Sequence, residues 1–110
     1  MRLPTDVTIA TEKLTRYLLV PQVRGDKSSF LAKAGYAVGN ADQLAKDLRE
    51  LGRVEEAVPQ NANEFGQYYE VRGELRGPNG KAVRVRTIWM RENLSEVTKF
   101  ITLLPDKRKR

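Results

Sequence analysis

The sequence predicts an α+β domain in which about three N-terminal helices pack on one face of a three- to four-stranded antiparallel sheet. Three observations predict it. Apolar residues recur at helical spacing up to residue 52. Beyond that point the period falls to near two, and aromatic and β-branched residues become common. Finally, a Gly-Pro-Asn-Gly segment at 77–80 separates two such stretches, as in a β-hairpin.

The first helix is expected over residues 11–20, where Leu14, Tyr17 and Leu18 recur at helical spacing. Thr11 is a suitable cap for its start. Pro21 cannot continue a helix, so the segment should end there.

Two further helices are expected before the sheet. The second covers 27–34, with Asp26 as its cap and Gly35 as the left-handed residue that closes it. The third starts at Asn40, which a Gln follows three positions later as in a capping box, and it should close at Gly52. The leucines that would form its apolar face are Leu44, Leu48 and Leu51.

The strands are expected at 53–59, 67–75, 82–90 and 98–104. Side chains alternate between the two faces of a strand, so Val85 and Trp89 should lie on the opposite face from Arg84 and Arg86. We expect the helices to cover the apolar face, with Trp89 in the core, and the arginine face to stay open to solvent.

Length and composition indicate a single folded domain. The chain has 110 residues, 40% hydrophobic and 31% charged, which is ordinary globular usage. We expect one domain at 1–105 and a basic tail at 106–110. No apolar run is long enough to span a bilayer and the first residues do not resemble a secretion signal, so a cytoplasmic location is expected.

The residue types limit the chemistry. The sequence has no cysteine and no histidine, which excludes disulfides, zinc sites of the Cys/His type and a serine-histidine triad. No metal and no cofactor is expected. The net charge of +6 favours polyanionic partners such as RNA. The 106–110 tail supplies +3 of it and residues 1–105 the other +3.

The predicted hairpin holds the candidate nucleic-acid-binding residues. Tyr68, Glu70 and Arg72 lie two residues apart on one predicted strand, so their side chains should point to one face. Arg84 and Arg86 have the same spacing on the next strand. Facing the same way, they would present guanidinium groups, a phenol and a carboxylate together. Such a surface can hold a phosphodiester and stack a base. The alternative is that these charges only form the solvated face of an antiparallel sheet.

A second candidate anion site precedes the second helix. Arg24 and Lys27 flank the helix start, where free backbone N–H groups favour anions. The alternative is that Asp26 itself occupies this position as the cap.

RNA cleavage without a metal needs proton transfer and charge stabilisation, which Glu, Lys, Tyr and Arg can provide.

Several short motifs give the chain a resemblance to a known family. The motifs are Tyr17-Leu18-Leu19 with Pro21; Gly25, Lys27, Phe30, Gly35 and Tyr36; Asn40 and Leu44; Gly66 and Tyr69; Gly77-Pro78-Asn79-Gly80; and Val85, Thr87 and Trp89. With these motifs the chain resembles a bacterial domain family of unknown function, about this length, found alone and as the C-terminal module of polymorphic toxins.

The resemblance implies a layout like that of small metal-independent ribonuclease toxins, such as colicin-type tRNA nucleases and ribosome-dependent mRNA interferases. It also implies a small acidic antitoxin or immunity protein as partner. Carried over by position, the polar residues implied for the site are Lys27, Tyr69, Arg86, Thr87 and Thr102. Relatives often carry a histidine where this sequence has Gln22 and Val23, so a member that only binds is a second outcome.

The leading hypothesis is therefore a toxin-like domain acting on nucleic acid as a metal-independent ribonuclease. Arg84 and Arg86 would hold phosphate, and Lys27, Glu70 or Tyr69 would transfer protons. The alternative is a non-catalytic module whose basic sheet face binds RNA or an acidic protein, which would give salt-sensitive binding without turnover. A third reading is a structural domain without a ligand, whose charges keep it soluble.

Overall fold

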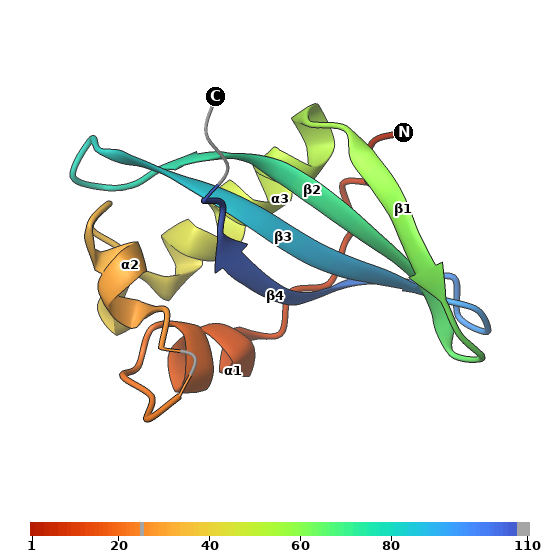
Figure 1. Cartoon of the computed structure of the whole chain (residues 1–110), viewed down its shortest axis with the longest axis horizontal. Helices are drawn as coiled ribbons and strands as arrows, with labels where there is room; N and C mark the ends of the chain where they lie inside the picture. Colours follow the sequence, from red (N-terminus) through yellow and green to blue (C-terminus); the bar gives the residue numbers. More distant parts are fainter. Residues whose placement is uncertain (25, 108–110) are drawn as a thin grey trace.

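Helices form one layer of the structure and a four-stranded antiparallel sheet forms the other (Figure 1). The structure is a computed structural model that describes residues 1–24 and 26–107. Gly25 and residues 108–110, the end of the expected tail, lie outside the described residues. The helices precede the sheet in sequence and lie together on one side of it. The predicted α+β class is confirmed.

The helical layer is built from short segments and one long helix. In chain order these are α1 (Thr11–Lys13), the π-helix η1 (Leu14–Leu18), α2 (Ser28–Ala32), the 3-10 helix η2 (Val38–Asn40) and α3 (Ala41–Val54). Gly35 has a φ of +92°, the left-handed conformation expected after the second helix. The Asp26 carboxylate accepts the backbone N–H of Ser28 at 3.0 Å, so Asp26 does serve the start of α2.

The sheet has the order β1-β2-β3-β4, with each strand antiparallel to its neighbours. The strands are β1 (Ala57–Ala62), β2 (Gly66–Arg76), β3 (Ala82–Glu92) and β4 (Thr98–Pro105). The β2–β3 hairpin pairs without interruption from Gly66 opposite Glu92 to Arg76 opposite Ala82. Its turn contains Gly80 at φ +85°, as the Asn-Gly pair predicts.

Two sequence expectations about α3 are wrong. The helix does not close at Gly52 but continues to Val54, so the strand expected at 53–59 begins only at Ala57. Gly52 is buried because the N-terminal segment crosses it: Leu3 N–H donates to the Gly52 carbonyl at 2.9 Å, and a Cβ there would lie 3.1 Å from the Leu3 side chain. A glycine here permits close packing rather than ending a helix.

The capping box expected at Asn40 is also absent. The Asn40 side chain turns back instead, accepting the N–H of Ala37 at 2.8 Å and donating to the carbonyl of Gly35 at 2.9 Å. Gln43 donates to Asp47, one turn further along α3, at 2.8 Å. Asn40 therefore fixes the turn that leads into α3 rather than its first N–H groups.

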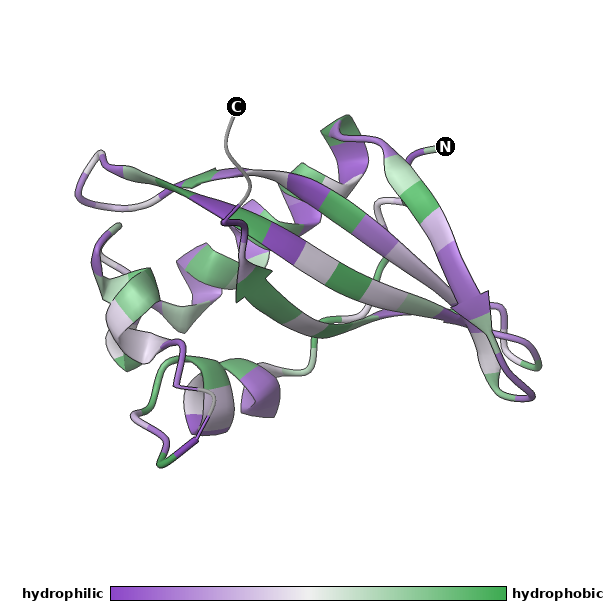
Figure 2. Cartoon of the chain, viewed as in Figure 1, coloured by the Kyte–Doolittle hydropathy of each residue, from purple (hydrophilic) through white to green (hydrophobic). Residues whose placement is uncertain are grey.

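The core lies between α3, η1 and the covered face of the sheet. Trp89 and Phe100 are both buried and meet edge to face, with ring centroids 5.3 Å apart. Leu44, Leu48 and Leu51 of α3 are buried in the same cluster, as their spacing predicts. Figure 2 shows the corresponding alternation of hydrophobic and hydrophilic residues along β2 and β3. Within the described part of the chain, no helix has the length and apolar character needed to cross a membrane.

Candidate functional site on the open face of the sheet

The arginines of the hairpin lie on the open face of the sheet, as the side-chain alternation predicts. Val85, Thr87 and Trp89 are fully buried on the face that the helices cover. Arg84 and Arg86 alternate with them and are only partly buried, with 34% and 36% of their side chains exposed. The helices therefore leave this face accessible to a ligand.

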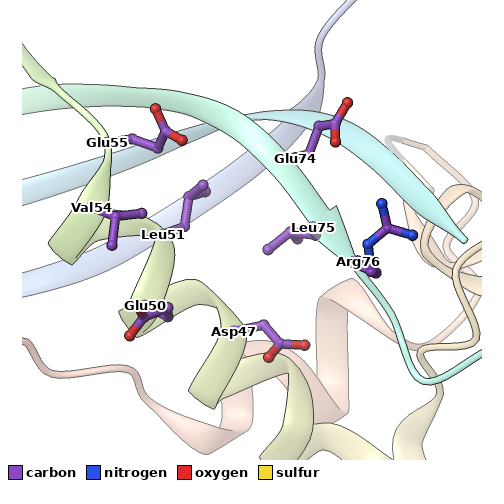
Figure 3. Close-up of a pocket in the computed structure, with 8 residues that line it drawn as sticks. All are labelled: Asp47, Glu50, Leu51, Val54, Glu55, Glu74, Leu75 and Arg76. Atoms are coloured by element: carbon purple, nitrogen blue, oxygen red, sulfur yellow. The ribbon is translucent and has the colours of Figure 1, made fainter. Parts of the chain in front are cut away.

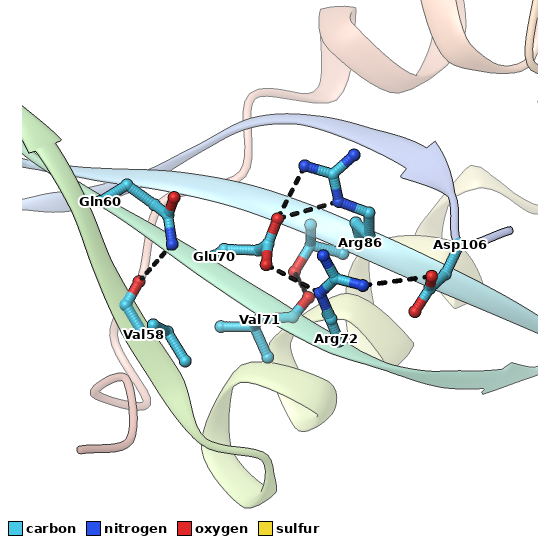
Figure 4. Close-up of polar contacts among 8 residues, drawn as sticks. Val58, Gln60, Glu70, Val71, Arg72, Arg86 and Asp106 are labelled. Atoms are coloured by element: carbon cyan, nitrogen blue, oxygen red, sulfur yellow. Dashed lines mark hydrogen bonds and ion pairs between the residues drawn. The ribbon is translucent and has the colours of Figure 1, made fainter. Parts of the chain in front are cut away.

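A single carboxylate organises the centre of this face. Glu70 accepts Arg72 Nε at 2.8 Å on one oxygen, and Arg86 Nε and Nη2 at 2.8 Å on the other (Figure 4). Arg72 and Arg86 are directly opposite each other on β2 and β3. Two like charges at such a position repel, and Glu70 between them offsets that repulsion.

The charged state of Glu70 follows from these contacts. Its side chain is only 11% exposed, and burial alone would raise the pKa of the carboxyl. The hydrogen bonds and charges of Arg72 and Arg86 outweigh burial and lower the pKa below its ordinary value. Glu70 in turn raises the pKa of Arg72. Glu70 is therefore ionised at neutral pH, and its two oxygens hold both guanidinium groups in place.

The open face is not the net cationic platform that the sequence led us to expect. Arg72 also pairs with Asp106 at 3.2 Å, and Arg84 lies 3.5 Å from Glu74. Each of the three arginines thus has a carboxylate partner, and the exposed guanidinium groups belong to a nearly balanced network. Phosphate binding here would have to compete with these carboxylates rather than fill an empty cationic site.

Two of the residues implied by the family resemblance lie on the other face of the sheet. Thr87 is fully buried; its hydroxyl donates to the Val71 carbonyl and accepts Trp89 Nε1, both at 2.8 Å. Tyr69 is partly buried and packs against the core. Both side chains are therefore separated by the sheet from Glu70.

The other candidates are spread over the molecule. Lys27 directly precedes α2, and Arg24 is exposed in the loop before it. Thr102 lies on β4 opposite Ile88, which itself is opposite Glu70, so Thr102 is in the same row across the sheet. Tyr68 is two residues before Glu70, on the same face. The open face therefore brings together Tyr68, Glu70, Arg72, Arg84, Arg86 and Thr102, but not Lys27, Arg24, Tyr69 or Thr87.

A separate pocket of about 220 Å³ lies between α3 and the end of β2 (Figure 3). Half of its lining residues are acidic, namely Asp47, Glu50, Glu55 and Glu74, and they lie beside Arg76 and three apolar residues. Within residues 1–24 and 26–107, however, no group of three or more carboxylates is arranged to hold a metal ion. The acid character also makes this pocket unsuited to a polyanion.

Asp106 was missed by the sequence reasoning, which assigned it to the tail. Its side chain is only 2% exposed, and its N–H donates to the Arg84 carbonyl at 3.0 Å, which continues the pairing of β4 with β3. Its spacing in the sequence could have indicated this position. Asp106 follows Thr102 and Leu104 at intervals of two, so in an extended strand all three side chains point to the open face.

Comparison with known domain families decides the classification. The profile of one family matches residues 3–107. The chain belongs to DUF6883, a domain family of unknown function. No curated protein gives a match to this DUF6883 domain. The sequence expectation of a family of unknown function is thus confirmed.

Among solved structures, the DUF6883 domain is similar to a chain from a "Contact-dependent growth inhibition toxin - immunity protein complex from Klebsiella pneumoniae 342". The TM-score is 0.71, and the match covers 90% of this chain and 99% of that chain. The sequences are 16% identical, so the similarity establishes a common fold.

Proposed function

We propose that this DUF6883 domain is a toxin-like domain that acts on nucleic acid, as a metal-independent ribonuclease. The observation that carries the proposal is the pair Arg72 and Arg86, both held by Glu70 on a sheet face that the helices leave open. Two fixed guanidinium groups side by side are suited to the oxygens of one phosphodiester.

The fold supports a toxin-like role. The structure with which the domain shares its fold comes from a complex of a growth inhibition toxin with an immunity protein. On this basis we propose a small acidic immunity protein or antitoxin as partner. Its carboxylates would compete with Glu70 and Asp106 for the guanidinium groups, so it would occupy the same face as RNA.

In the proposed reaction, Arg72 and Arg86 bind the phosphate and stabilise the charge that develops on it. The 2′-hydroxyl of the ribose loses its proton to Glu70 and its oxygen bonds to phosphorus. The bond between phosphorus and the 5′-oxygen breaks, which leaves a 2′,3′-cyclic phosphate. The 5′-oxygen takes a proton from water, and the hydroxide that remains accepts the proton held by Glu70. We propose Glu70 as the proton acceptor because Lys27 and Tyr69 do not lie on the open face of the sheet.

Substrate binding would also activate the base. In the free domain the two arginines lower the pKa of Glu70, which makes it a weak proton acceptor. A phosphate that draws the guanidinium groups toward itself removes part of that stabilisation. The pKa of Glu70 then rises toward its ordinary value, and the carboxylate becomes a stronger base only when substrate is present.

The test is cleavage of tRNA and total RNA by the purified domain in EDTA. We expect cleavage by the wild type, and its loss in Arg86→Ala. Arg91→Ala is the matched control, because Arg91 is on the same strand and pairs with Glu96 at the far end of the sheet. RNA that stays intact at micromolar protein would end the ribonuclease proposal.

A non-catalytic binding module is the second candidate, and the balanced charge of the open face favours it. The arginines of this face are already paired with carboxylates, and a charged partner could exchange with those carboxylates. The lowered pKa of Glu70 makes this carboxylate a weak general base, which favours binding over catalysis. This candidate predicts RNA or protein binding that weakens steeply with salt, with the RNA recovered at full length.

A further inference from the structure

A pocket of about 240 Å³ lies between η1 and the edge strand β4. It is lined by Lys13, Tyr17, Leu18, Ile101 and Thr102. Leu18 is buried and Ile101 half-buried, so the floor is apolar. Tyr17 is 63% exposed at the rim. The site therefore combines an apolar floor, an accessible aromatic ring, an ammonium group and a hydroxyl.

The helix that presents Tyr17 has unusual geometry. The N–H of Leu19 donates to the carbonyl of Leu14 at 2.9 Å, five residues back, so η1 is a π-turn. Such turns are rare and occur frequently at functional sites. Each residue of a π-turn advances less around the axis than in an α-helix. Tyr17 is thereby displaced from the apolar face on which Leu14 and Leu18 are buried.

The charges at this pocket favour an anionic ligand. Lys13 Nζ donates to the Ile101 carbonyl at 2.8 Å, which fixes the ammonium group beside the pocket and leaves it further N–H donors. Burial, and then the nearby charge of Lys99, lower the pKa of Lys13. The negative charge of a bound phosphate would offset both effects, because it favours the charged form of the lysine. Among the described residues, the Thr102 hydroxyl makes one long contact, 3.5 Å to the Leu103 carbonyl, so it can still bond to a ligand.

The pocket is also placed correctly relative to the arginine pair. Glu70 is opposite Ile88, and Ile88 is opposite Thr102, so the three lie in one row across three strands. Adjacent strands are about 4.8 Å apart, which places Thr102 roughly 10 Å from Glu70. An RNA strand that runs from a phosphate on Arg72 and Arg86 over the edge strand β4 would therefore reach the side of the pocket that Thr102 forms.

We propose that the pocket between η1 and β4 binds a nucleobase of single-stranded RNA, next to the phosphate on Arg72 and Arg86. Tyr17 stacks on the base, Lys13 contacts the phosphate of that nucleotide and Thr102 bonds to its polar edge. Stacking on an aromatic ring beside a cation is the usual way in which proteins hold unpaired bases. The inference rests on the proposed action on nucleic acid and adds a subsite for its substrate.

The test uses a fluorescent oligoribonucleotide with 2′-O-methyl groups, which binds but cannot be cleaved through the 2′-oxygen. We expect Tyr17→Ala to weaken its binding by about 5- to 150-fold, which corresponds to the loss of one base–aromatic stack. Tyr17→Phe keeps the ring and should bind as the wild type does. Phe65→Ala is the matched control, because Phe65 is 66% exposed at the far end of the sheet.

A second variant tests the cation. Lys13→Gln keeps a donor for the Ile101 carbonyl but removes the charge, so the slope of log affinity against log salt should fall by about 0.7. Wild-type binding that Tyr17→Ala and Lys13→Gln leave unchanged overturns the subsite and spares the proposed function. A wild type that binds no RNA overturns both.

Discussion

The Thr87→Val substitution tests whether Thr87 stabilises the fold or takes part in catalysis. Thr87→Val keeps the shape of the side chain but removes the acceptor of Trp89 Nε1, which is otherwise buried without contact with water. A buried donor left without a partner costs about 1–3 kcal/mol. Since no cavity forms, we expect the free energy of unfolding to fall by about 2 kcal/mol.

The assay is urea unfolding of a double-mutant cycle with Trp89→Phe. Phenylalanine has no N–H, so in that background Thr87→Val should cost less by about 1 kcal/mol or more. An equal cost in both backgrounds would contradict the hydrogen bond as the cause. RNA cleavage should survive in Thr87→Val, because the side chain lies beneath the sheet. Loss of cleavage without loss of stability would instead place Thr87 in the catalytic set.

The remaining predictions concern stability. The folded-state pKa of Glu70 is lowered from 4.5, so its contribution is complete above about pH 4.5 and is lost as the pH falls through the lower folded value. Glu70→Gln should therefore be less stable than the wild type at pH 7, by a margin that shrinks toward pH 3; a constant margin in urea titrations would contradict this. Gly77→Ala should destabilise by about 3 kcal/mol, because its Cβ would lie 1.9 Å from the Ala34 carbonyl oxygen. At Gly80 an added Cβ would meet open space, and only the φ of +85° is unfavourable for alanine. We therefore expect Gly80→Ala to cost about 1 kcal/mol. Thermal melts in which Gly80→Ala is less stable than Gly77→Ala would refute the packing argument.

The elements with strong local signals could be predicted from the sequence. The hairpin at 77–80 and the alternation along β3 depend on turn chemistry and on the period of two, and both are confirmed. The end of α3 could not be predicted, because it depends on Leu3 packing over Gly52, a contact between residues far apart in sequence. The capping box predicted at Asn40 was wrong for a similar reason, because the Asn40 side chain bonds to backbone groups of the preceding turn.

The candidate site was predictable in its position but not in its charge. Parity alone places Arg84 and Arg86 on the open face. Their neutralisation depends on the register between strands and on Asp106, which only the folded structure brings to Arg72. Tyr17 could not be placed either, because its exposure results from a π-turn, which hydrophobic spacing does not distinguish from a regular helix.

The position of Asp106, directly after β4, gives this residue control over the electrostatics of the sheet. Its carboxylate supplies one of the two counter-ions of Arg72. Neutralising that carboxylate alone, as in Asp106→Asn, would leave Arg72 and Arg86 sharing Glu70. The surface would then attract phosphate more strongly, so this one residue after β4 sets part of the affinity of the domain for polyanions.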